Sequence, residues 1–378
     1  MESPVKKMKI VVSTEEKSDC SSRDAQETQE NVLTYDVLRV IFGQLGAKDL
    51  CSAAQVCRLW KDAASKEASL RKYPEYFLKR YKIIDRDDAD NMYASELIGN
   101  ELRIRPVVAL ICAKVQEEKE WTLKGCYCQN LPIDCNAIFL GGYDIVLNDS
   151  KIQKGFGMAV GLFLSALPKL SHKLYHVNMH TFSGSSNIDI NAHAEHLVKQ
   201  LLSSKKEKSK CIIMLTDHSG YQFSKVIMKN LRKQYPIGKI SLWGGICTDL
   251  KVCEVSSSSR NCSQISQWAA ITLSSPTLQS WSIVLSQSCR KEEEVQEKLD
   301  KFKQSIALKK HSLGLMFACC ERLNKKDMEI AIFKRVFPNV PLIGLHGDGE
   351  YGLNTLNKKR EDTLWHAYTT IFLVLTYQ

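Results

Sequence analysis

The feature that most constrains the fold is a pattern that the chain repeats. The segment from Cys211 to Gly245 aligns without gaps with the segment from Leu313 to Gly347. Few residues are identical, but the apolar positions, an aromatic residue followed by Pro, and a Gly in the final turn coincide. A spacing of this kind indicates supersecondary units that stack on one another.

Each copy has the pattern of an apolar strand, an amphipathic helix, a Pro, a second apolar strand and a Gly-rich turn. An earlier copy, from Val107 to Gly142, aligns with one extra residue. The apolar runs are short and do not alternate with polar residues, which predicts strands covered on both faces. We therefore expect an α/β domain of mixed sheets with packed helices, built from strand–helix–strand units over residues 102–378. The expected elements include Ala109–Cys112, Gly157–Leu164, Ile212–Leu215, Ser224–Gln234, Trp268–Ser274, Trp281–Ser286, Leu315–Phe317 and Asp327–Val336.

A small all-α module is predicted before this domain, over residues 31–75. Apolar residues between Val37 and Leu45 recur at spacings of three and four, which places them on one face of a helix. Gly46 ends this helix, Asp49 is expected to cap a second helix over Leu50–Cys57, and a third helix begins at Arg58. The polar residues 1–30 predict a disordered tail, and the charged residues 76–101 predict a linker of helix and loop.

The spacing of the apolar residues in this module is distinctive. The run Leu33-x3-Val37-Leu38-x2-Ile41-Phe42-x2-Leu45, with Asp49-Leu50 and Val56-Cys57-Arg58-x-Trp60 after it, resembles an F-box. F-boxes are the motifs by which substrate adaptors bind Skp1 in cullin–RING ubiquitin ligases. They usually begin with Leu-Pro, where this chain has Leu33-Thr34, but Thr34 can also begin a helix.

A module of this size has a marginal core, so its excess apolar side chains are expected to complete their burial on another protein. The resemblance implies that this protein is Skp1, which brings cullin and a RING protein with it. The residues implied to bind Skp1 are Leu33, Val37, Leu38, Ile41, Phe42, Leu45, Leu50, Val56, Cys57 and Trp60.

The C-terminal part of the chain resembles a FIST domain. The resemblance lies in Leu315–Cys319, Phe337-Pro338, Gly347–Gly352 and Leu364-x-His366, whereas the Ser-rich segment Cys253–Gln264 has no clear alignment. FIST domains are sensory-type modules of bacterial signalling proteins, and one group of eukaryotic adaptors carries one behind an F-box. If small-ligand binding by bacterial relatives extends to this chain, the resemblance implies a ligand or substrate rim of Gly141, Gly142, Gly244, Gly245, Gly347, Gly349 and Glu350.

Composition excludes several other classes of protein. The 52 Lys and Arg against 42 Asp and Glu leave a net charge of +10, spread over short runs, so we expect no nucleic-acid partner. No apolar run approaches the roughly 18 residues of a membrane-spanning helix, and the N-terminal residues do not read as a secretory signal. The 14 Cys therefore predict reduced thiols in a cytoplasmic and nuclear protein.

The His and Cys residues do not form a persuasive metal pattern. The cysteines near position 130 lack a second ligand pair, and three histidines spaced by four residues lie in a predicted strand, about 13 Å apart. Two further histidines lie on a probable helix whose exposed face explains them. We expect no metal at these residues, which are Cys126, Cys128, Cys135, His172, His176, His180, His193 and His196.

Catalytic chemistry has little support in the sequence. Cys319-Cys320 ends an apolar strand, but no pattern selects a His to activate either thiol, and His346 and His366 are candidates only because they lie in the same half of the chain. The Gly347–Gly352 segment lacks the Lys-Ser/Thr of a phosphate-binding loop and reads instead as a tight hairpin that needs Gly for positive φ angles. We predict no catalytic residue and no cofactor.

The sequence thus predicts a non-catalytic adaptor of a Skp1–cullin–F-box ubiquitin ligase, with a substrate protein held by the C-terminal domain. The main alternative is a small-ligand sensor without a ligase role, and the third hypothesis is a cysteine-dependent enzyme. No sequence feature identifies the substrate.

Overall fold

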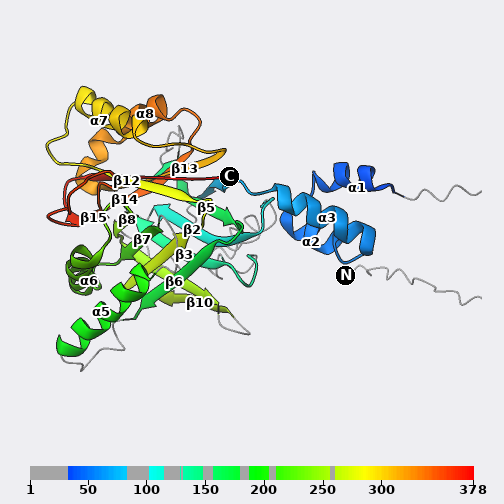
Figure 1. Cartoon of the computed structure of the whole chain (residues 1–378), viewed down its shortest axis with the longest axis horizontal. Coiled ribbons are helices and arrows are strands. Elements are labelled where there is room, and N and C mark those ends of the chain that lie inside the picture. The colour runs from blue at the N-terminus through cyan, green and yellow to red at the C-terminus, as the bar shows by residue number, and fades with distance from the viewer. Residues whose placement is uncertain are drawn as a thin grey trace, which may run out of the picture.

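The computed structural model describes residues 33–82, 102–114, 128, 131–147, 156–178, 187–203, 210–255 and 260–378. It shows a module of short helices followed by a larger domain of three β-sheets with helices on their outer faces (Figure 1). This α+β order agrees with the prediction. The predicted tail over residues 1–30 and most of the predicted linker lie outside the described residues.

The helical module consists of α1 (Tyr35–Phe42), α2 (Ala47–Ala53) and α3 (Arg58–Leu70). Thr34 caps α1, because its Oγ1 accepts the backbone N–H of Val37 (3.4 Å). The prediction for the second helix was wrong, since α2 begins at Ala47 and Asp49 lies within its first turn. The backbone N–H of Ala47 donates to Leu102 O (2.7 Å), so a contact with a distant segment holds the start of this helix.

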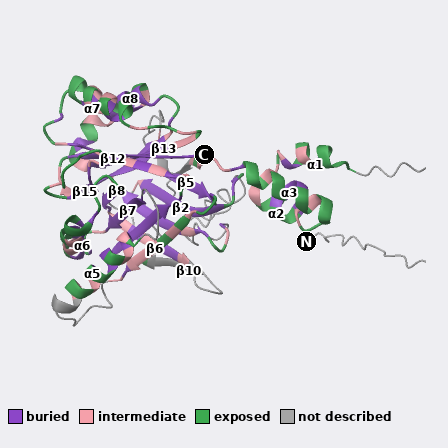
Figure 2. Cartoon of the chain, in the orientation of Figure 1, coloured by how far each residue is buried: buried purple, intermediate pink, exposed green. Residues whose placement is uncertain are grey.

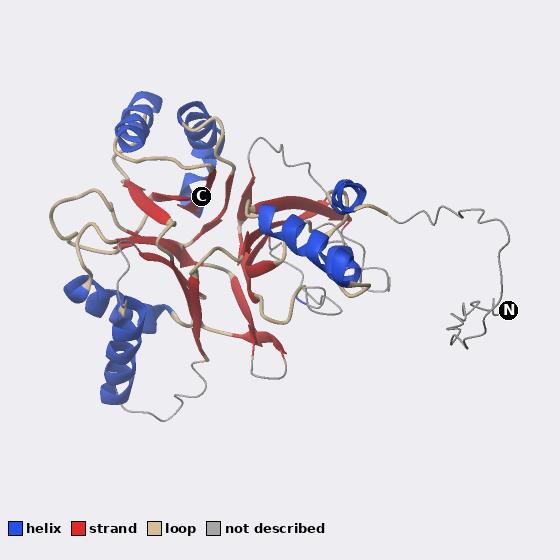
Figure 3. Cartoon of the chain, turned by 45° about the vertical axis from the view of Figure 1, so that its right-hand side comes forward, coloured by secondary structure: helices blue, strands red, loops and turns tan. Residues whose placement is uncertain are grey.

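The strands lie in the interior of the larger domain, with helices outside them (Figure 3). The three sheets that they form contain strands from distant parts of the chain. The first sheet has the order β1 (Glu75–Lys82), β5 (Phe156–Ser165), β2 (Pro106–Lys114), β3 (Asn136–Gly142), β9 (Asp249–Val255), β10 (Arg260–Ile265). The second has the order β6 (Ser171–Val177), β11 (Trp268–Ser274), β7 (Lys210–Thr216), β8 (Ile240–Ile246), β15 (Gly349–Gly352), β16 (Trp365–His366). The third has the order β12 (Gln279–Leu285), β17 (Thr370–Tyr377), β13 (His311–Cys319), β14 (Leu342–Gly347), β4 (Asp144–Leu147).

The first five strands of each sheet, in the orders given above, occupy equivalent positions. Each sheet has a parallel pair at its centre, namely β2 with β3, β7 with β8, and β13 with β14. The helix α6 (Tyr221–Gln234) connects the second pair, and α8 (Lys326–Val336) connects the third. The predicted strand–helix–strand unit is therefore confirmed for the second and third copies, whereas most of the connection between β2 and β3 lies outside the described residues. Two more helices, α5 (Asn187–Leu202) and α7 (Glu292–Gln304), precede the second and third pairs.

The units are joined by a cyclic exchange of strands. After its parallel pair, each unit sends one strand into the sheet of another unit: β4 pairs with β14, β9 pairs with β3, and β15 pairs with β8. The chain then returns to its own sheet as β5, β11 or β17. No unit completes its sheet alone, so the three units form one domain.

The expected linker over 76–101 was wrong at its beginning, because residues 75–82 form β1. This strand pairs antiparallel with β5, from Glu75 opposite Phe163 to Lys82 opposite Phe156. Its aromatic rings stack on the sheet, with the Phe77 and Phe163 centroids 5.1 Å apart. β1 occupies the same edge position as β6 and β12 in their sheets. The repeat therefore begins at β1, ahead of the predicted boundary at residue 102.

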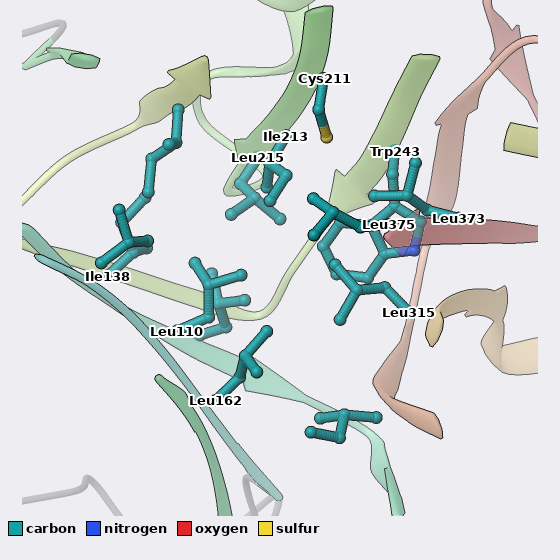
Figure 4. Packing of buried hydrophobic residues seen from close by; sticks show 14 of the residues in the cluster. Leu110, Ile138, Leu162, Cys211, Ile213, Leu215, Trp243, Leu315, Leu373 and Leu375 are labelled. Carbon is teal, nitrogen blue, oxygen red and sulfur yellow. The ribbon is translucent and has the colours of Figure 1, made fainter. Parts of the chain in front are cut away.

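The largest core lies between the three sheets (Figures 2 and 4). Leu110 from the first sheet, Leu215 and Trp243 from the second, and Leu315 from the third all belong to it. The Trp243 ring meets Phe317 edge-on, with centroids 5.8 Å apart. A separate cluster of buried apolar side chains lies between the second sheet and the helices α5 and α6. Another lies between the third sheet and the helices α7 and α8. No helix in the described ranges has the length and apolar character that a membrane crossing requires.

Candidate protein-docking module and strand-exchange junction

The helical module has its own small core. Leu38, Phe42 and Leu50 are buried in it, and Trp60 packs against it with its ring edge-on to Phe42 at 5.3 Å. Leu45 is also partly buried there. Buried side chains are not available on the module's surface, so Leu38, Phe42 and Leu50 support its fold instead of forming the outer face expected for them.

The remaining apolar residues of the predicted set are exposed. Leu33, Val37 and Ile41 each leave more than a third of their surface in water, and Val56 is 61% exposed. Cys57 is an exposed free thiol at the start of α3. This excess of exposed apolar side chains on a small helical module is what an unoccupied protein-docking face looks like.

Two further exposed residues were missed by the sequence reasoning, Val40 and Leu59. Val40 is 72% exposed and lies beside Val37 and Ile41 on α1, because residues three and four apart share one face of a helix. Its spacing from Val37 was the available signal. We define the docking face as Leu33, Val37, Val40, Ile41, Val56 and Leu59.

Arg71 connects the helical module to the sheet domain. Its side chain is almost fully buried after the end of α3. The guanidinium donates to Phe42 O (2.6 Å) and Leu45 O (2.7 Å) within the module, and to Arg103 O (2.8 Å) in the segment that leads into β2. Its Nε pairs with Glu67 (2.8 Å). One side chain thus holds both parts together.

Glu75, the first residue of β1, binds the same segment ahead of β2 that Arg71 contacts. Its Oε2 accepts the backbone N–H groups of Arg103 (2.8 Å) and Ile104 (3.1 Å). Burial raises the pKa of Glu75, although these two hydrogen bonds favour its ionised form. This carboxylate thus holds the segment 103–104, to which Arg71 also donates, against the start of β1.

The residues predicted to form a Gly-rich rim lie at the junction where the chain passes from the sheet of one unit to the sheet of another. A Cβ on Gly142 would lie 2.8 Å from His346 O, one on Gly245 2.2 Å from Gly349 O, and one on Gly347 2.1 Å from Ile246 O. These glycines allow neighbouring backbones to approach closely. The hairpin interpretation of Gly347–Gly352 was wrong, because β14 and β15 belong to different sheets and neither Gly347 nor Gly349 has a positive φ angle.

The turns that follow β3, β8 and β14 each donate one equivalent backbone hydrogen bond to a strand of another unit. Tyr143 N–H donates to His346 O, Thr248 N–H to Gly141 O, and Asp348 N–H to Ile246 O, each at 3.0 Å. All seven predicted rim residues are buried at this junction, so the rim is packed against neighbouring strands. A ligand-binding role for them stays a prediction.

Asp348 gathers polar groups from all three units. Its Oδ2 accepts the Tyr143 hydroxyl (2.9 Å) from the first unit and lies 2.9 Å from His218 Nε2 of the second. The Cys320 thiol of the third unit lies 3.5 Å from its Oδ1. Sequence reasoning missed His218 and Tyr143, because they are brought to Asp348 only by the strand exchange.

A second cluster of polar side chains at the junction surrounds Asp144. Lys326 donates to its Oδ2 (2.7 Å), and Lys114 lies 3.7 Å from its Oδ1. Directly across the β14–β4 ladder is His346, which is fully buried and has no hydrogen-bond partner on either ring nitrogen. Burial lowers the pKa of His346 to about 4, so the ring is neutral at pH 7.

Glu350 is the second buried titratable group of the junction. Its Oε2 accepts the Thr369 backbone N–H (3.1 Å) and hydroxyl (2.7 Å), while its Oε1 has no partner. Burial raises the pKa of Glu350 to about 7, against the opposing effect of the Thr369 hydrogen bonds. The carboxyl group is therefore partly protonated at neutral pH.

Two opposite pH dependences of stability are expected from these residues. Glu350 has a folded-state pKa of about 7, above the ordinary 4.5, so stability falls as the pH rises from 4.5 to 7. His346 has a folded-state pKa of about 4, below the ordinary 6.5, so stability falls as the pH drops from 6.5 to 4. Each effect amounts to about 3 kcal/mol over its full range.

Free energies of unfolding of Glu350→Gln and His346→Gln, measured between pH 4.5 and 7, check this expectation. Relative to the unmodified protein, Glu350→Gln should gain stability as the pH rises, and His346→Gln should lose it. Two difference curves that stay flat over this range would contradict the assignment of buried, shifted groups.

The thiols beside this junction are poorly suited to nucleophilic chemistry. Burial and the charges of Cys319 and Asp348 raise the pKa of Cys320 to about 12. Burial and the Glu350 carboxylate also raise the pKa of Cys319. A thiol must ionise to attack, so these shifts disfavour the role of either Cys as a nucleophile at neutral pH.

The predicted histidine pairs lie as follows. His172 and His176 are on β6, as expected for a strand, and His180 lies outside the described residues, as does Cys126. His193 and His196 are on α5, where His196 Nε2 contacts the Gln200 amide (2.9 Å). Among the described residues, His, Cys, Asp and Glu nowhere gather in threes at metal-binding distance.

Comparison with known proteins gives one family match and two curated relatives. Residues 35–74, which cover α1–α3, match the F-box-like family. F-box only protein 22 from Homo sapiens and from Pongo abelii are each 28% identical to the chain over 120 residues, which is 28% of this chain and 30% of each relative. The chain therefore aligns with less than a third of the length of these relatives. It contains an F-box-like domain, and its similarity to F-box only protein 22 is weak.

Proposed function

We propose that the protein is the substrate-recognition adaptor of a Skp1–cullin–F-box ubiquitin ligase. The observation that carries this proposal is the coincidence of the F-box-like match with a three-helix module whose aliphatic side chains face solvent. Skp1 is the partner expected at the docking face, and cullin and a RING protein follow through Skp1. The protein then acts as a non-catalytic subunit in the cytoplasm and nucleus.

The physical basis of this binding is apolar burial. Covering one exposed Val, Leu or Ile side chain contributes roughly 1.5–3 kcal/mol, before the costs of association are subtracted. Val37, Val40 and Ile41 lie together on α1, so one groove on a partner can cover all three. Their shared face makes α1 the central element of the proposed interface.

The sheet domain is the proposed substrate holder, and we infer that it is of the FIST type. Its contribution to ubiquitin transfer is to keep a substrate lysine at high effective concentration near the charged conjugating enzyme. The hydrogen bonds of Arg71 support this role, because they connect the helical module to the segment ahead of β2, which Glu75 in turn holds against β1. The substrate is then presented in a defined orientation.

Replacing Val37 by Glu together with Ile41 by Lys is expected to abolish co-purification with Skp1. The pair removes two apolar side chains from the docking face and introduces a Glu–Lys pair four residues apart, which favours the helix. Both residues are exposed, so the module should remain folded. Co-expression with Skp1 and affinity purification measures the result.

A matched control places the same Glu–Lys pair elsewhere on the module. Ser65→Glu with Ser69→Lys changes two exposed positions of α3 and should leave Skp1 binding intact. Circular dichroism of both variants verifies that the helices persist. Skp1 binding by the folded Val37→Glu, Ile41→Lys variant would rule out the proposed docking face.

A further inference from the structure

A cationic ridge runs along the exposed side of α6. Lys225, Lys229, Arg232 and Lys233 are exposed and recur at spacings of three and four, which places them on one stripe of the helix. At 1.5 Å per residue, the stripe from Lys225 to Lys233 is about 12 Å long. An extended peptide covers this length with about four residues.

A second segment adds charge beside this stripe. Arg360 stacks over Tyr235, with its guanidinium carbon 4.6 Å from the ring centroid, and donates to Tyr235 O (3.0 Å). Arg232 Nε donates in turn to Glu361 O (2.9 Å). These contacts hold the segment 355–361 against the end of α6, where Lys358 and Lys359 are exposed. We define the cationic ridge as Lys225, Lys229, Arg232, Lys233, Lys358 and Lys359.

The carboxylates near the ridge already have partners. Glu361 accepts the side-chain amides of Asn354 (3.0 Å) and Asn357 (2.8 Å), and Glu195 of α5 pairs with Lys199 (2.9 Å). Asp362 lies 3.9 Å from Arg232 and is fully exposed. Among the described residues, no carboxylate forms an ion pair with Lys229, Lys233, Lys358 or Lys359. Arg232 therefore has a weak partner in Asp362. Lys199 and, less strongly, Lys233 lower the pKa of Glu195. The four lysines just named are nevertheless in no ion pair within the described part of the chain, which leaves the ridge positive.

Apolar side chains lie at one end of this surface. Ile237 and Leu356 are each about 40% exposed. Their turns are in contact, since a Cβ on Gly238 would lie 4.0 Å from Thr355 O. A partner with both acidic and aliphatic side chains fits such a surface. Single-stranded nucleic acid fits less well, because no exposed aromatic ring stands between Lys225 and Arg232 to stack a base.

We infer that the cationic ridge docks an acidic segment of a partner protein, with an aliphatic residue of that segment on Ile237 and Leu356. Charge complementarity identifies this occupant, because several unpaired cations favour a run of Asp or Glu. The inference goes beyond the adaptor function and does not require Skp1. If the adaptor function holds, proteins with such a segment are a class of substrate.

Fluorescence anisotropy with a labelled polyglutamate peptide, leucine at each end, tests this inference. Lys229→Glu with Lys233→Glu should weaken binding by about tenfold or more, because both charges are reversed at exposed, unpaired positions. The control Lys301→Glu with Lys310→Glu makes the same charge change outside the ridge, on α7 and just before β13. It should have little effect on peptide binding, although it also removes the Lys301–Glu297 ion pair. Replacing the terminal leucines of the peptide by serines should also weaken binding.

Three results would overturn the inference: no saturable binding by the unmodified protein, an equal loss in the control variant, or tighter binding of a single-stranded oligonucleotide of the same charge. The last result would reassign the ridge to nucleic acid. Skp1 co-purification by the Lys229→Glu, Lys233→Glu variant is expected to persist, since α1–α3 are unchanged. This measurement separates a failure at the ridge from a failure of the adaptor proposal.

Discussion

Replacing Arg71 by Ala is expected to detach the helical module from the sheet domain and to destabilise the module by about 3 kcal/mol. The change removes the donor for three backbone carbonyl groups, those of Phe42, Leu45 and Arg103. These carbonyls then lose a charged hydrogen-bond partner in a largely buried place. A module of about 40 residues has little stability of its own to offset this loss.

Hydrogen–deuterium exchange measures this effect separately in the two parts of the protein. The amides of α1–α3 should exchange faster in Arg71→Ala, while those of β7, β13 and β17 should be unchanged. Arg58→Ala is the matched control, because Arg58 is an exposed residue of the same helix. Arg71→Lys should show partial loss, since a single ammonium cannot donate in all the directions of the guanidinium.

Unaltered exchange in Arg71→Ala would show that the module holds itself together without this anchor. In that case the orientation of the docking face would depend on the chain connection and on other contacts such as that of Ala47 N–H with Leu102 O. The proposed adaptor function would survive this result, but the defined presentation of a substrate would not follow from Arg71.

The second large effect is expected at a buried ion pair behind the third sheet. Glu329, in the first turn of α8, is fully buried against Arg322, whose Nε donates to its Oε1 (3.0 Å). Thr370 of β17 donates to the other carboxylate oxygen (2.7 Å), and Arg322 also donates to Cys289 O (3.1 Å). Glu329→Ala leaves a buried guanidinium without its counter-charge, which should cost about 3–5 kcal/mol.

Changing both partners to apolar residues separates charge burial from packing. Arg322→Met with Glu329→Leu should destabilise the protein less than Glu329→Ala alone, because no uncompensated charge stays buried. Thermal and urea unfolding provide the comparison. The exposed pair of Arg335 and Glu292, with an N···O distance of 3.1 Å, is the control, and Glu292→Ala should change stability by less than about 1 kcal/mol. A double variant less stable than Glu329→Ala would contradict this explanation.

Much of the fold could be predicted because it depends on local patterns. The apolar runs in β7 and β13, the helices α6 and α8 between the paired strands, and the repeat that relates them all follow from hydrophobic spacing. The start of α2 could not be predicted in this way, because Ala47 donates to a carbonyl that is distant in the sequence. β1 was missed because Tyr76, Phe77 and Leu78 are followed by basic residues, and this sequence has no clear strand pattern beside a charged segment.

For the candidate sites too, local sequence patterns predicted some features, and contacts between distant residues decided the others. Val37 and Ile41 on α1 were predicted as docking residues and Val40 was missed, and spacing did not distinguish the buried Leu38 and Phe42 from these exposed side chains. That distinction depends on which face of α1 packs on α3. At the junction, the glycines were identified as functional candidates, whereas the structure shows them where strands of different units approach closely.

By itself, the sequence determined the order of a small helical module and a larger repeated α/β domain, since helical and strand periodicity are local properties of a chain. Only the tertiary structure decided that each unit completes another unit's sheet, that Asp348 collects groups from all three units, and that Arg71 joins the module to the sheets. Those contacts connect residues far apart in sequence, and their partners are selected by backbone hydrogen bonding and burial once the sheets have formed.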